Sequence, residues 1–195
     1  WIRPELWKAQ DALKDIEGRT GYGGYDFAAV NDLTAAMYIF PDEDGNGIDI
    51  LRLIFLPEER VESVAARTNA PFHEWVRQGL IITTPGQTMN YNFVKERDRE
   101  IRERYQIDSS GIDPWQSIQF RADLEADGIK IEKVPQTNQR LHAVVEEAER
   151  LLSLHGFRHG GDPVLEWCAS NVVLNIDGRG MKRLSKDASA EKIDP

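Results

Sequence analysis

The sequence has little cysteine, no long apolar run and fewer basic than acidic residues. Its single cysteine in 195 residues, Cys168, excludes an internal disulfide framework and any zinc module built on several cysteines, and it fits a reducing compartment. No apolar run approaches the roughly 18 residues that a membrane-spanning helix needs, and no signal peptide is visible, so we expect no membrane partner. Lys and Arg number 24 against 33 Asp and Glu, a formal net charge of −9, which argues against a generic basic surface for nucleic acid.

The chain also lacks the phosphate-binding loop of an ATPase. No G-x-x-x-x-G-K-[ST] pattern occurs, and the glycine-rich GYGGYD at 21–26 has no lysine. We therefore expect no ATP hydrolysis from these residues. Hydrophobic residues make up 41% of the chain, which is enough for a full core.

Hydrophobic patterning predicts a mixed α/β fold. Aromatic and β-branched runs predict three strands in series over 22–30, 33–40 and 48–56, arranged as an antiparallel meander. Helices and short strands then alternate, and the clearest helix is 138–154, where apolar residues recur every three or four positions. The further helices are expected over 58–66, 71–79, 91–105, 116–127 and 163–170, and the further strands over 80–84, 110–113, 129–134 and 171–177. This order indicates one mixed sheet with helices on both faces.

Two motifs that resemble metal sites are better explained as turns. The run that starts at Asp42 copies the first half of a calcium loop, but Leu53 stands where a bidentate Glu is required. His155 and His159 are four residues apart and could be combined with Cys168, yet three glycines interrupt the helix that would align the two histidines. We therefore predict a hairpin turn in the first case and a structural turn in the second.

Four aspartates stand at positions that are unusual for surface acids. Asp26 lies in a run that reads as a buried first strand, where an unpaired carboxylate costs several kcal/mol. Asp113 ends a short strand just before a proline, Asp32 falls at the turn into the second strand, and Asp194 lies in KIDP near the last residue. Carboxylates at neighbouring strand ends suit two hard cations such as Mg²⁺ or Mn²⁺, which can activate water and stabilise the leaving oxygen of a phosphodiester. From spacing alone, caps, turns and salt bridges remain open alternatives.

Five segments carry a resemblance to a known family: GYDFAAVNDLTAAMYIFP, FHEWVRQGLIITTPGQTMNYNFV, GIDPWQSIQFRADLEADGI, FRHGGDPVLEWCASNVVL and KIDP. In this order they resemble the C-terminal nuclease domain of the large terminase subunit of tailed bacteriophages and prophages. The resemblance implies a ribonuclease H-like fold. It also implies an endodeoxyribonuclease that uses two Mg²⁺ or Mn²⁺ ions to cut concatemeric phage DNA at packaging initiation and termination.

The same resemblance implies a domain organisation and partners. Residues 1–20 are expected to be the tail of a connection from an N-terminal ATPase domain, and residues 21–195 the nuclease domain, truncated at its C-terminal end. The implied partners are double-stranded DNA, the ATPase domain of the same polypeptide, the small terminase subunit and the portal, in the cytoplasm of the host bacterium.

Matched residue by residue, the resemblance assigns roles to the four aspartates. Asp26 matches the acid that bridges both metals, Asp113 the second acid and Asp194 the late acid, and these three are expected to be catalytic. Asp32 matches an additional acid that supports the metal site in some members. A turn or a helix cap remains the alternative for Asp32.

A basic stretch near the end of the chain is the candidate DNA contact. Residues 179–186 hold four positive charges and no acid, between two strand-like segments. This pattern predicts contacts with the DNA backbone from four side chains, Arg179, Lys182, Arg183 and Lys186. The alternatives that remain are an ordinary solvated loop here and, for the whole chain, a resolvase- or transposase-type nuclease or a non-catalytic docking module.

Overall fold

The computed structural model describes residues 1–27, 33–113 and 118–185, and the chain forms two compact units. Of the described residues, the first unit comprises Trp1–Glu17, Ile39–Leu51 and those from Val134 onward. The second comprises those of Gly18–Tyr38 and Arg52–Lys133.

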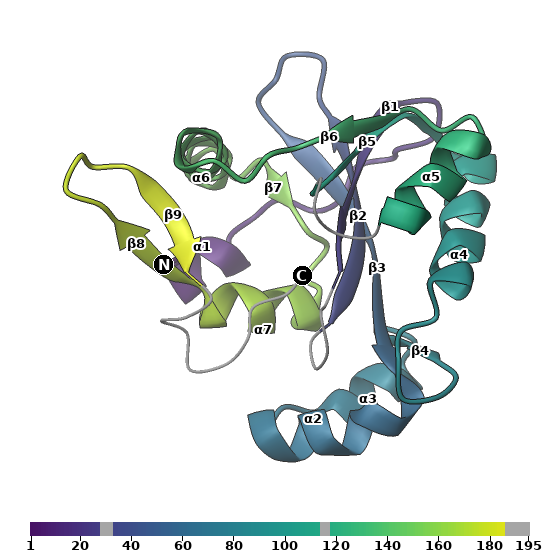
Figure 1. The fold of residues 1–195 in the computed structure, drawn as a ribbon. Coiled ribbons are helices and arrows are strands. Elements are labelled where there is room, and N and C mark those ends of the chain that lie inside the picture. The colour runs from purple at the N-terminus through teal and green to yellow at the C-terminus, as the bar shows by residue number, and fades with distance from the viewer. Residues whose placement is uncertain (28–32, 114–117, 186–195) are drawn as a thin grey trace. The chain divides into compact units, whose positions relative to one another are not determined.

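The main sheet has seven strands, and its strand order is β4-β3-β2-β1-β5-β6, with β7 paired to β3 (Figure 1). The strands are β1 (Thr20–Asp26), β2 (Thr34–Pro41), β3 (Ile48–Pro57), β4 (Ile82–Thr84), β5 (Gln106–Ile112), β6 (Ile131–Lys133) and β7 (Phe157–Arg158). The pairs β1 with β5, β3 with β4 and β5 with β6 are parallel. The expected mixed α/β class is confirmed, and the first three strands are neighbours in chain order as predicted.

The helices of the second unit include two that lie side by side, α4 and α5 (Figure 1). The helices are η1 (Glu58–Arg60), α2 (Val61–Thr68), α3 (Phe72–Arg77), α4 (Tyr91–Arg104) and α5 (Ile118–Ala126). Ion pairs from Lys95 to Asp123 and from Arg99 to Asp127 connect α4 with α5. Asn90 begins α4 as its N-cap, since its side chain accepts hydrogen bonds from two backbone amides of the first turn.

Gly23 of β1 leaves room for the side chain of Ser110 on the neighbouring strand β5. Gly23 pairs with Ser110, and a Cβ at Gly23 would lie 2.2 Å from the Ser110 Oγ. A side chain at this position would displace the Ser110 hydroxyl, which accepts a hydrogen bond of 2.6 Å from Arg102. This contact explains Gly23 of the GYGGYD segment, whereas a Cβ at Gly24 would meet nothing within 4 Å.

The first unit contains three helices, the short strand β7 and a separate hairpin. These elements are α1 (Pro4–Lys8), α6 (Asn138–Ser153), α7 (Pro163–Asn171) and the antiparallel pair β8 (Val173–Ile176) and β9 (Lys182–Ser185). Asp162 is the N-cap of α7, since its carboxylate accepts hydrogen bonds from two backbone amides of the first turn. Proline occupies the first helical position.

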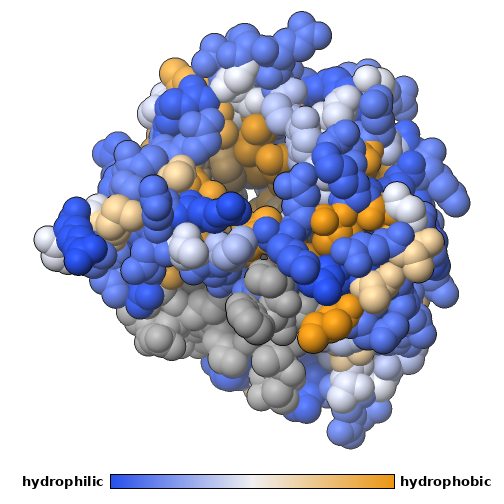
Figure 2. All heavy atoms as spheres, turned by 45° about the horizontal axis from the view of Figure 1, so that its top comes forward, coloured by the Kyte–Doolittle hydropathy of each residue, from blue (hydrophilic) through white to orange (hydrophobic). Residues whose placement is uncertain are grey.

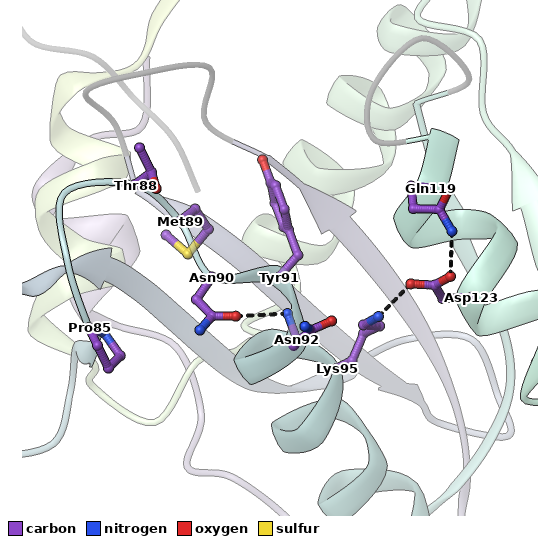
Figure 3. A pocket seen from close by; sticks show the side chains of 9 residues that line it. All are labelled: Pro85, Thr88, Met89, Asn90, Tyr91, Asn92, Lys95, Gln119 and Asp123. Atoms are coloured by element: carbon purple, nitrogen blue, oxygen red, sulfur yellow. Dashed lines mark hydrogen bonds and ion pairs between the residues drawn. The ribbon is translucent and has the colours of Figure 1, made fainter.

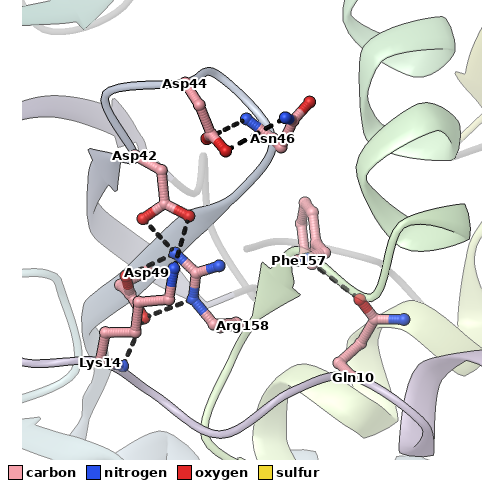
Figure 4. A network of polar contacts seen from close by, with 8 residues as sticks. All are labelled: Gln10, Lys14, Asp42, Asp44, Asn46, Asp49, Phe157 and Arg158. Atoms are coloured by element: carbon pink, nitrogen blue, oxygen red, sulfur yellow. Dashed lines mark hydrogen bonds and ion pairs between the residues drawn. The ribbon is translucent and has the colours of Figure 1, made fainter.

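A buried ion network holds the first unit together (Figure 4). The Arg158 guanidinium donates to both carboxylate oxygens of Asp49 at 2.8 Å and to Asp42 at 2.7 Å. The Lys14 ammonium also donates to Asp42 at 2.9 Å. Burial by itself raises the pKa of the Asp42 carboxyl, but hydrogen bonds from Lys14 and Arg158 outweigh it and hold the pKa below its ordinary value.

The HGGD segment forms a tight turn that fastens the first residues of the chain. Gly160 and Gly161 have φ of +67° and +69°, a conformation that favours glycine. His159 stacks on Trp7 with ring centroids 4.1 Å apart, its Nδ1 accepts from the Gly161 amide and its Nε2 lies 3.0 Å from the Trp7 carbonyl. The structural turn predicted for His159 is confirmed, and so is the hairpin turn that begins at Asp42, whose amide bonds to the Gly47 carbonyl.

Three differences from the sequence prediction concern the main sheet. Strand β5 begins at Gln106, four residues before the predicted start, because its first half alternates exposed polar and partly buried residues and has no continuous apolar run. Strand β7 was not predicted, since two residues carry no period. Strand β1 ends at Asp26, and the rest of the predicted strand over 22–30 lies largely outside the described residues.

The molecular face shown in Figure 2 is mostly hydrophilic, and its apolar residues occur in small separate groups. Among residues 1–27, 33–113 and 118–185, no helix is long and apolar enough to cross a membrane.

Candidate functional site

Two of the predicted metal ligands lie at the same edge of the sheet. Asp26 is the last residue of β1, and Asp113 directly follows β5. The strands are parallel with Tyr25 opposite Ile112, so the next residue of each strand, Asp26 and Asp113, are neighbours across the ladder. Both aspartates are half-buried. Since side chains alternate along a strand, Asp26, as the last residue of β1, projects from the face opposite to Tyr25.

The other two predicted ligands, Asp32 and Asp194, lie outside the described residues. In the described part of the chain, no group of three or more His, Cys, Asp or Glu side chains gathers as a metal site. The structure therefore brings together two of the four predicted aspartates. Two adjacent carboxylates, partly open to water, are the oxygen donors that Mg²⁺ and Mn²⁺ prefer, so this donor set fits such an ion.

A buried polar network lies directly behind these two strands. Asp98 of α4 is fully buried, with 0% exposure. It accepts hydrogen bonds of 2.6 Å from the hydroxyls of Tyr25 and Tyr38 and of 2.8 Å from the Arg102 Nε. Arg102 also donates to the Tyr25 hydroxyl at 3.0 Å and to the Ser110 Oγ at 2.6 Å. Helix α4 is thereby joined to β1, β2 and β5 by one set of hydrogen bonds.

Burial and neighbouring charges keep both tyrosines neutral and Arg102 charged. Burial raises the pKa of both tyrosine hydroxyls, and the nearby Asp98 charge raises it further, so Tyr25 and Tyr38 act as donors. Burial opposes the charge on Arg102, but Tyr25 and Asp98 outweigh it and raise the pKa of the guanidinium. Asp98 therefore faces two neutral hydroxyl donors and one cation.

Sequence reasoning did not identify this network. The only local signal is the spacing of Asp98 and Arg102, which are four apart on one helix face and form an ion pair. Such spacing is common on solvated helices, and the tyrosines that complete the network come from β1 and β2.

The predicted DNA-binding residues fall on the β8–β9 hairpin of the first unit. Arg179 lies in its turn and is exposed, and Lys186 lies outside the described residues. The Lys182 ammonium is paired with Glu146 at 2.5 Å and Glu149 at 2.6 Å, both on α6. These two carboxylates neutralise Lys182 and attach the hairpin to the helix.

Arg183 has a different environment from Lys182. It is exposed and pairs across the hairpin with Asn175. Since neighbouring residues of a strand alternate in direction, its side chain projects from the face opposite to Lys182. Of the three described basic residues, Arg179 and Arg183 present their charge to solvent.

Comparison with known proteins identifies the family. Residues 1–195 match the family model described as "Terminase large subunit, endonuclease domain". The large terminase subunit of Enterobacteria phage HK97 is 32% identical over 196 residues, which cover 100% of this chain and 39% of that protein. The protein YmfN of Escherichia coli K12 is 25% identical over 191 residues, covering 93% of this chain and 42% of that protein. The chain thus spans about two fifths of the length of both relatives.

Solved structures show the same fold. The crystal structure of the HK97 large terminase superposes with a TM-score of 0.90 at 32% identity, covering 99% of this chain and 40% of that one. The large terminase nuclease of thermophilic phage G20c with bound magnesium superposes with a TM-score of 0.52 at 12% identity, covering 92% of this chain and 84% of that one. The expected ribonuclease H-like α/β fold, a central mixed sheet flanked by helices, is confirmed.

Proposed function

Because the chain belongs to the family of terminase large subunit endonuclease domains, we propose that it cuts double-stranded DNA with Asp26 and Asp113 as metal ligands. The observation that carries this assignment is the parallel register of β1 and β5, which makes the two aspartates neighbours at one sheet edge. The magnesium-bound nuclease of phage G20c supports a divalent ion as cofactor.

The proposed reaction is phosphodiester hydrolysis with two Mg²⁺ or Mn²⁺ ions. When bound, such ions lower the pKa of an attacking water and neutralise the leaving oxygen. Asp26 and Asp113 would hold the cations by their carboxylates, and Asp32 and Asp194 would complete the ligand set. The water oxygen would bond to phosphorus and give up a proton, the bond from phosphorus to the 3′ oxygen would break, and the 3′ oxygen would take up a proton. The products are a 5′-phosphate and a 3′-hydroxyl.

The hairpin is the proposed contact with the DNA backbone. Arg179 and Arg183, with Lys186 after β9, supply charges for phosphate oxygens. Lys182 contributes mainly by fixing the hairpin to α6 through Glu146 and Glu149.

The biological role is proposed at the level of the whole terminase. We infer that this domain cuts concatemeric phage DNA at the start and end of packaging, in the cytoplasm of the host bacterium. Its proposed partners are an ATPase domain of the same polypeptide, the small terminase subunit and the portal. The 100% coverage of this chain by the HK97 large terminase supports this assignment.

The test is cleavage of supercoiled plasmid by the purified chain in Mg²⁺, in Mn²⁺ and in EDTA. We expect cleavage only with metal, and Asp26→Asn or Asp113→Asn to lower the rate about 100-fold or more, because each removes a charged ligand. Asp108→Asn is a matched control, since Asp108 lies on the same strand β5 and pairs with Lys130. Cleavage by Asp26→Asn at the wild-type rate would remove Asp26 from the site.

A further inference from the structure

A second site lies beside the sheet edge that carries the candidate metal ligands. An open cavity of about 450 Å³ is formed by the loop before α4, the first turn of α4 and one side of α5. Figure 3 shows Tyr91 and Asn92 on the α4 side of this cavity and Gln119 and Asp123 on the α5 side. The volume lies in the range of ordinary small-ligand sites.

Ring contacts connect the cavity to the end of β1. The Tyr91 ring packs edge-on against Phe27 with centroids 5.2 Å apart, and Phe27 directly follows Asp26. Phe120 of α5 directly follows Gln119 of the cavity wall, and its ring packs against Phe27 with centroids 4.6 Å apart. The cavity and the proposed metal ligands therefore share the carboxyl edge of the strands, with the cavity on the Phe27 side of β1 and the Asp26 side chain on the other.

The charges in the cavity cancel. Lys95 is 9% exposed, and its ammonium forms an ion pair with Asp123 at 2.5 Å. Asp123 also accepts from the Gln119 amide at 2.7 Å. The hydrogen bond from Lys95, followed by that from Gln119, holds the pKa of Asp123 below its ordinary value. Asp123 therefore stays ionised, and the Lys95 ammonium beside it balances its charge, so the pair offers no net charge to a phosphate.

Neutral polar groups remain for a ligand. Within the described residues, the Thr88 hydroxyl, the Tyr91 hydroxyl and the Asn92 carboxamide make no hydrogen bond with protein. Hydroxyls and carboxamides donate and accept at once, which suits the mixed donor and acceptor edges of a base and the oxygens of a sugar. Met89 and Tyr91 add apolar surface to the same wall.

We propose that this cavity binds the nucleoside part, base edge and deoxyribose, of a nucleotide next to the cleaved phosphodiester. The proposal rests on the nuclease function, which places the scissile phosphate at Asp26 and Asp113. The cavity gives the domain a contact with the DNA that depends on the base and is independent of charge. The proposal thus gives a ligand to residues 84–92 (TPGQTMNYN), which belong neither to the proposed metal site nor to the hairpin.

The test compares cleavage kinetics of the wild-type chain with those of Tyr91→Phe, Asn92→Ala and the double variant. Tyr91→Phe keeps the ring packing and removes only the hydroxyl, and Asn92→Ala changes an exposed residue of the first turn of α4. The matched control is Asn138→Ala, an exposed asparagine in the first turn of α6. Each lost hydrogen bond is expected to raise KM roughly two- to tenfold, with kcat within about twofold.

Two further readouts separate a nucleoside contact from a phosphate contact. KM is measured at several salt concentrations. The slope of log KM against log salt concentration should stay that of wild type, because no phosphate contact is lost. Duplexes with a single abasic site at successive positions around the cut should bind more weakly to wild type at one or two adjacent positions. The double variant should show no further loss at those positions, because the base and the side chains then act as one pair.

Several results would overturn the proposal. One is a KM for the double variant equal to that of Asn138→Ala; another is a reduced salt slope, which would indicate a phosphate contact. An abasic effect that is the same in wild type and the double variant would also contradict it. If the wild-type chain cleaved no DNA with any metal, the proposed nuclease function itself would fail, whereas wild-type cleavage with unaltered variants would remove only the cavity's role.

Discussion

Asp98 is a carboxylate with no exposure to water, placed behind the strands that end in the proposed metal ligands. A buried charge persists only where hydrogen bonds and an opposite charge replace water, and Asp98 has two tyrosine donors and Arg102. Its partners Tyr25 and Ser110 belong to β1 and β5. Asp98 therefore helps to fix both strands against α4.

Asp98→Asn should destabilise the fold by about 3–5 kcal/mol, because Arg102 is then left buried without its counter-charge. The measurement is urea unfolding followed by tryptophan fluorescence. Glu100→Gln is the matched control on the same helix, since its exposed pair with Arg97 is worth about 0–1 kcal/mol. Equal midpoints for the two variants would show that the buried pair adds no stability.

Asp42 makes the stability of the fold depend on pH in the acid range. Its pKa is lower in the folded chain than the ordinary 3.8, so the unfolded chain binds the proton more tightly. The contribution of Asp42 is fully present above about pH 4 and is lost as pH falls below 3.8 towards the folded pKa. Thermal unfolding between pH 2 and 6 should therefore show a smaller acid loss in Asp42→Asn than in wild type, and parallel curves would contradict this.

Residue types and positions predicted part of the candidate site. Asp26 stands out in sequence because it interrupts a run that reads as a buried strand, and Asp113 because it ends a short strand just before a proline. Asp98 and Arg102 do not, since the amphipathic period of α4 shows them as members of a charged helix. Only the hydroxyls of Tyr25 and Tyr38, brought in from strands more than 50 residues away, make their burial possible.

The basic residues of the β8–β9 hairpin fall into two groups with different surroundings. Lys182 faces α6 and is neutralised by two glutamates, whereas Arg183 projects from the other face and Arg179 lies in the exposed turn. Of these three residues, only Arg183 and Arg179 can neutralise DNA phosphates and so release counterions.

Replacing Arg179 and Arg183 by Gln should weaken DNA binding and reduce the salt slope by about 2, roughly 1 for each lost phosphate contact. Fluorescence anisotropy with a labelled duplex at several salt concentrations measures both. Arg77→Gln, an exposed arginine of α3 paired with Glu74, serves as the control. An unchanged slope in the double variant would assign the backbone contact to another surface.

Helices were predictable from the sequence where the periodic pattern extended over many residues, as for α4 and α6. The lateral order of strands was not, because the pairing of β1 with β5 joins residues that are 86 or 87 positions apart, such as Thr20 with Gln106 and Tyr25 with Ile112. That pairing makes Asp26 and Asp113 neighbours, so the geometry of the site depends on a contact that no local pattern encodes.

At the scale of the whole molecule, the net charge of −9 no longer argues against DNA. Internal ion pairs, including those of Asp49 with Arg158 and Asp123 with Lys95, take up acids and bases in equal number and leave this excess unchanged. Two further acids form the proposed metal site, where bound cations would reverse the local sign. The exposed arginines of the hairpin and the neutral cavity beside α4 supply the proposed contacts with DNA.

The most direct test of the proposed metal site is a crystal of this protein soaked in Mn²⁺, with an anomalous difference map collected at the manganese edge. The account predicts a peak in contact with the carboxylates of both Asp26 and Asp113, and its loss in Asp26→Asn. A map without a peak at these residues, at a Mn²⁺ concentration that saturates cleavage in solution, would contradict it.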